Sequence, residues 1–393
     1  MEGLSTRLIH HPYRAPDGFD AAPVAVHKAS TVFFPNVAAL RTRRWQDKSG
    51  YTYGLHGTPT TFTLEERLAT LEGARHCVLA PSGLAAIALV DLALLRAGDE
   101  VLIPDNAYGP NLALAQHELA GWGITHRVYD PMDPADLAAS IGERTRLVWL
   151  EAAGSVTLEF PDVPALVEVV RRANAGRARP IVTALDDTWG AGVAYQPFDW
   201  GVDVTMQALT KYASGGADVL MGAVCTRDEA LHHALLMTHM RLGLGVGAND
   251  AEAVLRGLPS LELRYRAQDE RCRALAQWLA RQPRVARVLH PALPGSPGHE
   301  HWRRLARGAA ALLTLVFEPD VASERIDAFC DALRLFRLGY SWAGPVSLCV
   351  PYDIPAMRQR PWPHAPRVVR LAVGLEDVED LRADLAQAWA ALG

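Results

Sequence analysis

One lysine stands out in a chain whose positive charge comes almost entirely from arginine. The 393 residues include 39 basic side chains, of which only Lys28, Lys48 and Lys211 are lysines. An amine can lose its proton and form a Schiff base, whereas a guanidinium cannot. Lys211 follows the apolar run from Val202 to Met206. Most loop lysines are solvated, but at the ligand-binding end of a buried strand the lysine pKa falls, which favours a nucleophile.

A carboxylate follows the preceding apolar run in the same way. Asp186 comes directly after Ile181 to Leu185. Taken alone, such an aspartate is best explained as a cap for the next element. Paired with Lys211 one strand later, it is also placed to hold the protonated nitrogen of a pyridine ring.

Three further positions have the chemistry of a binding site. Ser82-Gly83-Leu84 forms a small-residue turn between a strand and a helix, and such a turn presents backbone amides to a phosphate. Tyr108 follows another strand, where it either stacks on a ring or covers the sheet edge. Arg370 lies inside the apolar strand Val368 to Val373, so it requires either an internal acid or a substrate carboxylate.

Several other functions are not supported. The formal net charge is −5 without basic or acidic blocks, so we expect no nucleic-acid or membrane partner. The five cysteines are scattered and contain no C-x-x-C pair, which fits a reducing compartment. The first 20 residues lack the apolar segment of a secretory signal. We therefore expect a cytoplasmic protein.

Histidine pairs do not indicate a metal site either. His10-His11, His232-His233 and the pair His299 and His301 lack a carboxylate or cysteine at a matching spacing. We expect them on the surface or in loops and expect no bound metal. No G-x-S-x-G motif supports a serine hydrolase, and no apolar stretch is long enough to span a bilayer, which takes about 20 residues.

The elements that position these residues alternate between strands and helices. Apolar runs without polar faces are typical of parallel strands buried on both sides. The predicted strands are 77–80, 101–104, 125–129, 147–150, 181–185, 202–206 and 223–225. Helical patterns cover 85–96, 111–119, 134–140 and 164–173, and another helix is predicted to start at Thr63.

The pattern changes at both ends of this region. Residues 1–57 lack helical periodicity and are predicted to form an arm that contacts a neighbouring subunit. From residue 258, a long arginine-rich helix over 261–280 precedes two strands, 311–317 and 368–373, and two further helices. We therefore predict a cofactor-binding domain over 58–257 and a smaller α/β domain over 258–393.

Several motifs in order resemble one enzyme family. They are Tyr51-Thr52-Tyr53-Gly54-Leu55-His56-Gly57-Thr58-Pro59, Leu185-Asp186-Asp187-Thr188-Trp189, Ala208-Leu209-Thr210-Lys211-Tyr212, His290 to Gly295, and Arg370-Leu371-Ala372-Val373-Gly374-Leu375-Glu376-Asp377. The chain resembles the cysteine and methionine metabolism family of pyridoxal-phosphate (PLP) enzymes. The resemblance implies PLP fold type I, which is aspartate-aminotransferase-like, with a mostly parallel seven-stranded sheet and a smaller C-terminal α/β domain.

The resemblance also implies a role for each matching residue. Lys211 would be the Schiff-base lysine, Asp186 would pair with the pyridine nitrogen, and Tyr108 would stack on the ring. Gly83, Leu84 and Thr210 would hold the phosphate. The candidate catalytic residues are Lys211, Tyr108 and Tyr51, and the substrate carboxylate would meet Arg370 with Ser341 nearby.

The resemblance also implies a role for the N-terminal arm. The family is typically a homotetramer built as a dimer of dimers, in which Tyr51 would reach the phosphate site of a neighbouring subunit. Tyr53 stands where the family usually has an arginine that bridges to the phosphate. Three other departures, expected near the substrate pocket, are Gly216 for histidine, Ala152-Ala153 for Ser-Pro, and Val346 for glutamate.

The segment Tyr340-Ser341-Trp342-Ala343-Gly344 looks like the β-lyase branch, because γ-acting relatives usually lack the tryptophan. That branch implies cleavage of L-cystathionine, or of a related cysteine S-conjugate, to a thiol, pyruvate and ammonia. A γ-acting synthase, sulfhydrylase or lyase is the alternative. A second alternative is a protein that binds PLP without catalysing a reaction. The presence of Lys211, Asp186 and Arg370 disfavours it.

Overall fold

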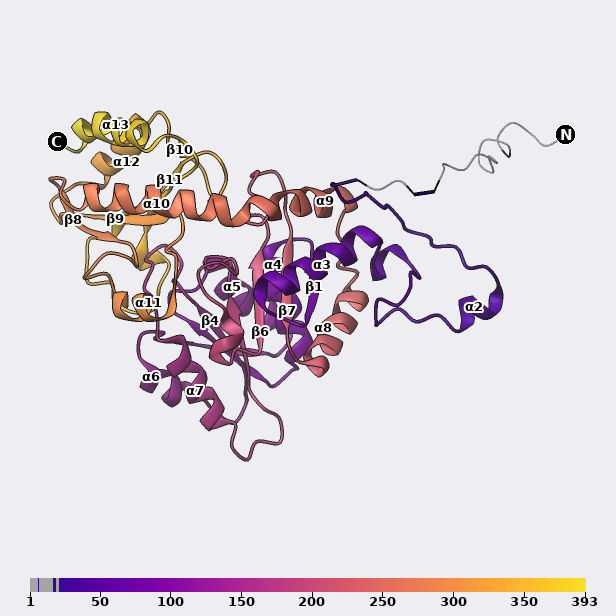
Figure 1. The fold of residues 1–393 in the computed structure, drawn as a ribbon. Coiled ribbons are helices and arrows are strands. Elements are labelled where there is room, and N and C mark those ends of the chain that lie inside the picture. Colours follow the sequence, from indigo (N-terminus) through magenta and orange to yellow (C-terminus); the bar gives the residue numbers. More distant parts are fainter. Residues whose placement is uncertain (1–5, 7–16, 19–20) are drawn as a thin grey trace.

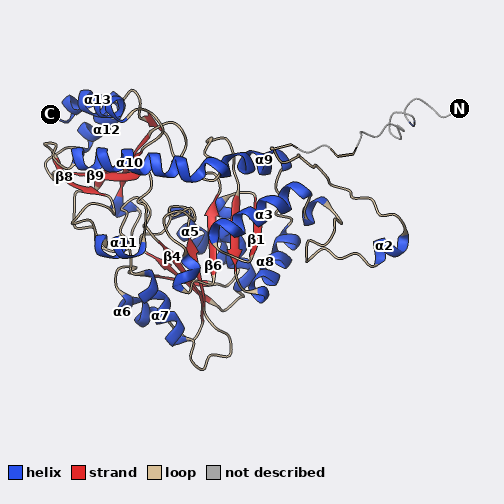
Figure 2. Ribbon diagram, in the orientation of Figure 1, coloured by secondary structure: helices blue, strands red, loops and turns tan. Residues whose placement is uncertain are grey.

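A seven-stranded sheet forms the centre of the computed structural model, which describes residues 6, 17–18 and 21–393 (Figures 1 and 2). Its strand order is β1-β7-β6-β5-β4-β2-β3. The strands are β1 (His76–Ala80), β2 (Glu100–Pro104), β3 (Thr125–Tyr129), β4 (Thr145–Glu151), β5 (Val182–Asp186), β6 (Val204–Ala208) and β7 (Gly222–Thr226). Each of the seven predicted apolar runs is one of these strands, so the predicted α/β class is confirmed.

Strand direction explains where a site can form. Strands β2 to β6 pair in parallel, and β7 pairs antiparallel with both β6 and β1. Because β1 therefore points the same way as β6, the carboxyl ends of β1, β2, β4, β5 and β6 share one edge. Ligands of such sheets bind at that edge.

Helices cover both faces of this sheet. One face packs against α4 (Gly83–Leu94), α8 (Glu229–Leu242) and the region of α5 (Gly109–Leu114), which continues into a π-helical turn over Ala115–Leu119. The opposite face packs against α3, α6 (Pro134–Ser140), α7 (Val163–Ala173) and α9 (Ala248–Gly257). Two apolar layers therefore enclose the central strands, as their apolar runs predict.

Helix α3 (Pro59–Glu72) begins earlier than its sequence pattern indicates. The prediction of a start at Thr63 is wrong, because Thr58 caps the helix. Its hydroxyl accepts a hydrogen bond from the Thr61 amide, and the Thr61 hydroxyl accepts one from the Thr58 amide. This reciprocal cap, with Pro59 at the first helical position, stabilises a start four residues upstream.

A second, five-stranded sheet has the order β10-β11-β12-β9-β8. Helix α10 (Leu261–Leu279) reaches it from the large sheet, with Leu261 and Tyr265 in the large core and Cys272 and Leu275 in the small one (Figure 1). The other elements are β8 (Val285–Leu289), α11 (His299–Leu305), β9 (Leu312–Phe317), α12 (Ser323–Ala332), β10 (Arg337–Leu338), β11 (Leu348–Asp353), β12 (Arg367–Ala372) and α13 (Val378–Ala388).

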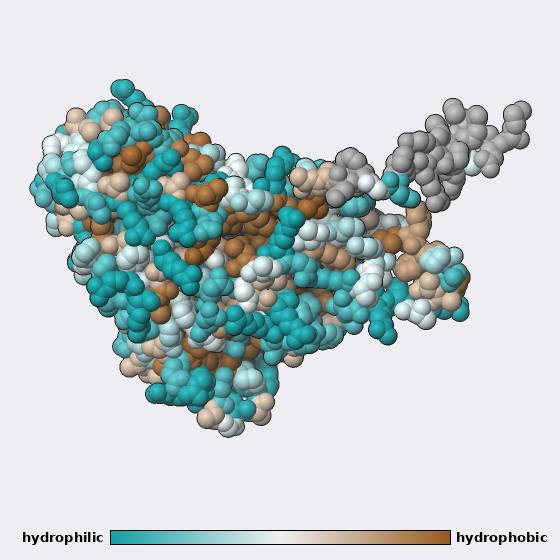
Figure 3. All heavy atoms as spheres, viewed as in Figure 1, coloured by the Kyte–Doolittle hydropathy of each residue, from teal (hydrophilic) through white to brown (hydrophobic). Residues whose placement is uncertain are grey.

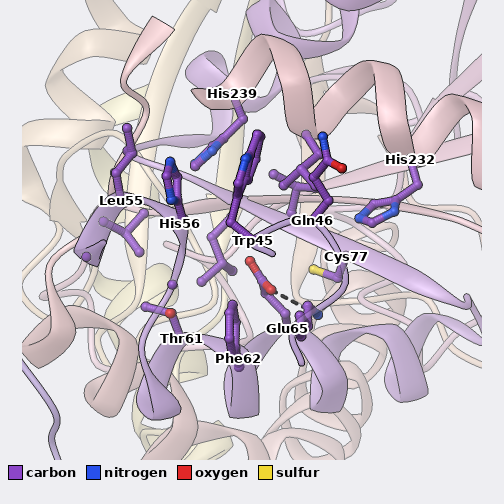
Figure 4. A pocket seen from close by; sticks show the side chains of 18 residues that line it. Trp45, Gln46, Leu55, His56, Thr61, Phe62, Glu65, Cys77, His232 and His239 are labelled. Carbon is purple, nitrogen blue, oxygen red and sulfur yellow. Dashed lines mark ion pairs between the residues drawn. The ribbon is translucent and has the colours of Figure 1, made fainter. Parts of the chain in front are cut away.

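Part of the predicted arm packs on its own chain. After the short helix α2 (Val37–Arg41), Trp45 stacks on His56, with 4.6 Å between ring centroids. Lys48 forms ion pairs with Glu65 and Glu66 of α3. The dashed line at Glu65 in Figure 4 marks the first of these. The first 20 residues, including His10-His11 and the stretch inspected for a secretory signal, lie mostly outside the described residues.

Over the part of the chain that the structure describes, no helix is both long and apolar enough to cross a membrane.

The five cysteines are buried and their thiols are free, as their spacing predicts.

Candidate active site

A cavity of about 570 Å³ lies where the carboxyl edge of the large sheet meets the small sheet. The large sheet contributes residues that follow β1, β2, β5 and β6. The small sheet contributes β12 and the turn before β11. Nine of the predicted site residues line this cavity, namely Gly83, Leu84, Tyr108, Asp186, Thr210, Lys211, Ser341, Trp342 and Arg370.

Lys211 projects into the cavity with its amine held in place. Its Nζ donates a hydrogen bond to Ser341 Oγ at 2.7 Å and lies 5.7 Å from the centroid of the Trp342 ring. Burial lowers the pKa of Lys211 to about 8, and the charge of Arg370 adds to this effect while Asp186 opposes it. A sizeable neutral fraction is therefore present near neutral pH, as a nucleophile or base requires.

Asp186 lies at the end of β5 on the same edge. Its Oδ1 accepts a hydrogen bond from the Thr188 amide at 2.9 Å. No helix begins there, but the carboxylate caps the turn that follows, so the capping role and the site role coexist. Burial raises the pKa of Asp186, while Thr188 and the positive charge of Lys211 oppose the rise. A cationic ring nitrogen placed against this carboxylate would favour its charged form.

The phosphate end of the predicted site is the start of α4. Ser82 caps the helix by accepting a hydrogen bond from the Ala85 amide, and Gly83 is the first helical residue. A Cβ on Gly83 would lie 2.6 Å from the Cβ of Ala208, so only glycine lets the helix approach β6 this closely. The free amides and positive end of the 12-residue helix therefore face the cavity beside Thr210.

Tyr108 also lines the cavity and is the N-cap residue of α5. Its backbone amide donates to Glu151 Oε2 at 2.8 Å. Glu151 is the last residue of β4 and pairs in register with Asp186. Burial, together with the nearby charge of Asp186, raises the pKa of Glu151 well above its usual value. The glutamate thus fixes the backbone that carries the tyrosine.

Arg370 reaches the cavity from β12. It is 7% exposed, and its Nη2 donates to the Ser341 carbonyl at 3.1 Å. Its Nε is buried without a hydrogen-bond partner, and the groups that act on its charge are Tyr352, Cys349 and Tyr340 rather than a carboxylate. The sequence leaves two partners open for Arg370, an internal acid or a substrate carboxylate. The described residues do not provide the internal acid.

The turn between the small-sheet strands β10 and β11 brings Ser341 to both charged groups. Ser341 has φ 96° and Ala343 has φ 64°, in the region that non-glycine residues seldom adopt. Such conformations cost about 1–3 kcal/mol each and persist only when the surroundings hold them. Here the Lys211 and Arg370 hydrogen bonds hold Ser341, and Trp342 packs edge-on against Tyr212.

Tyr51 and Tyr53 are not among the residues lining the cavity of their own chain. Tyr51 stacks on Phe62 and Tyr53 lies edge-on to His56, and each side chain is 46% exposed. Among the departures expected near the pocket, only Ala153 lines it. Gly216 and Val346 do not line the cavity of the single chain, where Gly216 adjoins Asp218 and Val346 faces outward.

Sequence reasoning missed Glu151, Tyr352 and Met357, which also line the cavity. Glu151 could have been found, because it directly follows the predicted strand 147–150. The placement of His232 on the surface or in a loop is also wrong. It is a buried residue of α8, three positions after Glu229.

A second buried acidic cluster lies behind Asp186. Glu72 accepts hydrogen bonds from Thr205 and Gln207, and it adjoins Asp187. Asp187 in turn accepts one from the Gly192 amide at 3.0 Å. Burial raises the pKa of Glu72 to about 7 and that of Asp187 well above its usual value. Burial therefore disfavours two negative charges on this pair.

The cavity residues together fit PLP. They provide an amine, a carboxylate at the end of the adjacent strand, a helix start for the phosphate, and a buried guanidinium whose Nε has no partner. The Arg370 Nε can donate a hydrogen bond to the carboxylate of a ligand bound against the PLP ring.

Known proteins are similar to this chain over nearly its full length. A family model described as Cys/Met metabolism PLP-dependent enzyme matches residues 5–390. A protein named putative cystathionine beta-lyase from Rhizobium johnstonii is 39% identical, covering 99% of this chain and 96% of its own. Cystathionine beta-lyase MetC from Escherichia coli K12 is 37% identical, covering 98% of both. The solved structure of metB from Corynebacterium glutamicum is 27% identical, with a TM-score of 0.87 over 100% and 99% of the two chains.

Proposed function

The chain belongs to the Cys/Met metabolism family of PLP-dependent enzymes, and on that premise we propose that it is a carbon–sulfur β-lyase. Its substrate is L-cystathionine or a related cysteine S-conjugate. The products are a thiol, which is homocysteine in the case of cystathionine, together with pyruvate and ammonia. The names of the similar proteins support this assignment.

The observation that carries the proposal is the arrangement of Lys211, Arg370 and the Ser341-Trp342 turn around one cavity. Arg370 binds the substrate α-carboxylate through its fork of N–H groups. Ser341 contacts both Arg370 and Lys211, so it sets the distance from the bound carboxylate to the amine. The Cα–H bond of the substrate then faces Lys211.

Lys211 acts as the base. Its pKa of about 8 allows the neutral amine to remove the Cα proton near neutral pH. When bound, PLP supplies an electron sink for the pair released at Cα. With PLP bound, Asp186 would keep the ring nitrogen protonated, and Tyr108, whose backbone is fixed by Glu151, would cover the ring. The substrate Cβ–S bond breaks as the thiolate leaves.

The oligomer belongs to the same proposal. We propose a cytoplasmic homotetramer built as a dimer of dimers, in which Tyr51 and Tyr53 reach the cavity of a neighbouring subunit. Their exposure and their absence from the cavity lining of their own chain support this role. Phe33 is 93% exposed, and apolar residues gather on the face shown in Figure 3, near its middle. Such exposed apolar surface is typical of an interface.

The test is a product assay on protein loaded with PLP. L-Cystathionine is added, and the keto acids are separated and identified. Pyruvate, released together with homocysteine, is the expected result. If 2-oxobutyrate is formed instead, the enzyme acts at the γ carbon and the β-lyase assignment fails.

The matched variant is Lys211→Ala. It should lose the yellow absorption of lysine-bound PLP and the keto-acid product together. Lys48→Ala, which changes another of the three lysines but lies outside the cavity, should retain both. If Lys211→Ala keeps full turnover, Lys211 is not the base.

A further inference from the structure

Three potential metal ligands meet at the opposite end of β1 from the cavity. They are His76, the first residue of β1, with Glu229 and His232 from the first two turns of α8. One ligand atom from each lies within 4.8 Å of the other two. Glu229 and His232 are three residues apart, so they face the same side of the helix.

The contacts within this group are short but incomplete. His76 Nε2 lies 3.1 Å from Glu229 Oε2, yet it is buried without a well-aligned hydrogen bond. The His76 and His232 rings stack with 4.2 Å between centroids and 7° between planes. A buried nitrogen that lacks a hydrogen bond and lies beside a carboxylate and a second imidazole is a site for a cation.

We propose that His76, Glu229 and His232 form a zinc-binding site that ties the edge strand β1 to α8. Two imidazoles and one carboxylate are a donor set that zinc commonly takes, with a fourth position left for water. Bonds of about 2.0–2.1 Å place tetrahedral ligand atoms roughly 3.3 Å apart. The three side chains must therefore close inward slightly, and the two rings must turn out of their stack.

The surroundings suit a metal site of modest affinity. His232 is buried, so packing holds its ring beside the other two ligands. Glu229 is 69% exposed, which leaves its carboxylate free to move onto the ion. The nearby Lys48 ammonium is paired with Glu65 and Glu66, and this reduces its repulsion of a cation.

The proposed zinc site lies away from the catalytic cavity. His232 projects from α8 beside Cys77 and near Glu65, over the cavity between the arm and α3 (Figure 4). Strand β1 runs from His76 to Ala80 and then leads to the Ser82-Gly83 turn. Five strand residues span about 15 Å, so the ion braces the start of β1 without touching the cofactor. The effect is on stability rather than on the reaction.

The test measures zinc binding by the full chain loaded with PLP. Protein freed of metals by a chelator is titrated with zinc chloride and followed by calorimetry. We expect one zinc ion per chain and a higher melting temperature with zinc. Glu229→Gln and His232→Gln should each bind zinc at least tenfold more weakly. Because Glu229 is exposed, its variant tests the site even if His232→Gln does not fold.

The matched control is His233→Gln, which removes an exposed histidine adjacent to His232 on the same helix. It should bind zinc as the unmodified chain does. X-ray absorption of the bound zinc should show nitrogen and oxygen neighbours. The proposal is overturned if no zinc binds, if all variants bind it equally, or if sulfur neighbours place the ion on Cys77.

Discussion

Arg370 carries a buried positive charge whose counter-ion is not among the described residues. An unpaired charge in the interior is costly. The cost is tolerated where a ligand supplies the missing carboxylate, and the partnerless Nε marks the direction from which it comes. Arg370 therefore contributes to recognition of the substrate at some expense of stability.

We predict that Arg370→Lys raises KM for cystathionine and lowers kcat/KM about a hundredfold. Lysine keeps the charge but loses the planar fork of N–H groups that donates to a carboxylate at two points. Losing a hydrogen bond to a charged group costs about 1.5–3 kcal/mol, and every 1.4 kcal/mol is roughly a factor of ten. Steady-state kinetics measures both constants.

Arg367→Lys is the control for this prediction. Arg367 begins the same strand and pairs with Asp327 outside the cavity. Its variant should retain normal constants. Equal losses in both variants would mean that β12 itself is disturbed and that Arg370 has no special contact with substrate.

Several site residues can be predicted from the sequence because each is unusual for its surroundings. Lys211 is a rare lysine, Asp186 ends an apolar strand, and Arg370 interrupts one. Glu151 also ends a strand, but no partner nearby in sequence identifies its role. His232 and His76 are 156 residues apart, and only the pairing of β1 with β7, which leads into α8, brings them together.

At the scale of elements, the acidic pair behind β5 links three segments. Glu72 ends α3, Thr205 and Gln207 belong to β6, and Asp187 follows β5. The hydroxyl of Tyr195 donates to the Ala152 carbonyl. Burial, followed by the charge of Asp187, raises the pKa of Tyr195 well above its usual value. The hydrogen bonds of these two acids therefore join the helix, the sheet and the loop beside the cavity.

We predict that this pair makes stability depend on pH. The pKa of Glu72 rises from 4.5 to about 7 on folding because the side chain is buried. The folded state then binds more protons than the unfolded state over that range, so stability falls as pH rises from about 4.5 through about 7. Glu72→Gln, whose amide replaces the protonated carboxyl, should lose much of this dependence. Each unit of pKa difference corresponds to about 1.4 kcal/mol.

Melting temperatures between pH 5 and pH 8.5 measure this effect. The expected result is that the melting temperature falls less steeply with pH for Glu72→Gln than for the unmodified chain. The control is Glu143→Gln, which changes an exposed glutamate in the turn before β4 and should follow the unmodified chain. Parallel curves for all three proteins would show that the pair does not hold a proton.

Elements buried on both faces are the ones that can be predicted from sequence. The central strands are continuous apolar runs because helices cover both of their sides. Strand β8 has exposed residues at Ala286 and Arg287, β10 is two exposed residues long, and β11 contains Pro351. These strands lack a clear periodic pattern. Their pairing depends on neighbours that are distant in the chain.

At the scale of the whole molecule, the proposed shared site can be tested by mixing subunits. Tyr51 lies on a segment that packs on α3 of its own chain but presents half of its ring outward. In a two-fold dimer, the same patch of each subunit contacts the other. Each cavity would then contain Lys211 from one chain and Tyr51 from the next.

We predict that co-expressed Tyr51→Ala and Lys211→Ala chains recover activity that neither has alone. In the mixed dimer, one of the two sites combines an intact Lys211 with an intact Tyr51, so roughly half of the sites become active. Two different affinity tags isolate the mixed species, and the pyruvate assay measures turnover. Activity no greater than the sum of the two parents would place Tyr51 outside the neighbouring site.

The contact between Gly83 and Ala208 has a consequence for how the cofactor is captured. Because the start of α4 is pressed against β6 and capped by Ser82, its amides have little freedom to lose when an anion arrives. Binding to a rigid, preorganised cradle carries a small entropy penalty. Affinity for the phosphate group is therefore set mainly by the enthalpy of its contacts. A substitution that loosens this packing, such as Gly83→Ala, should show up first as faster escape of the cofactor.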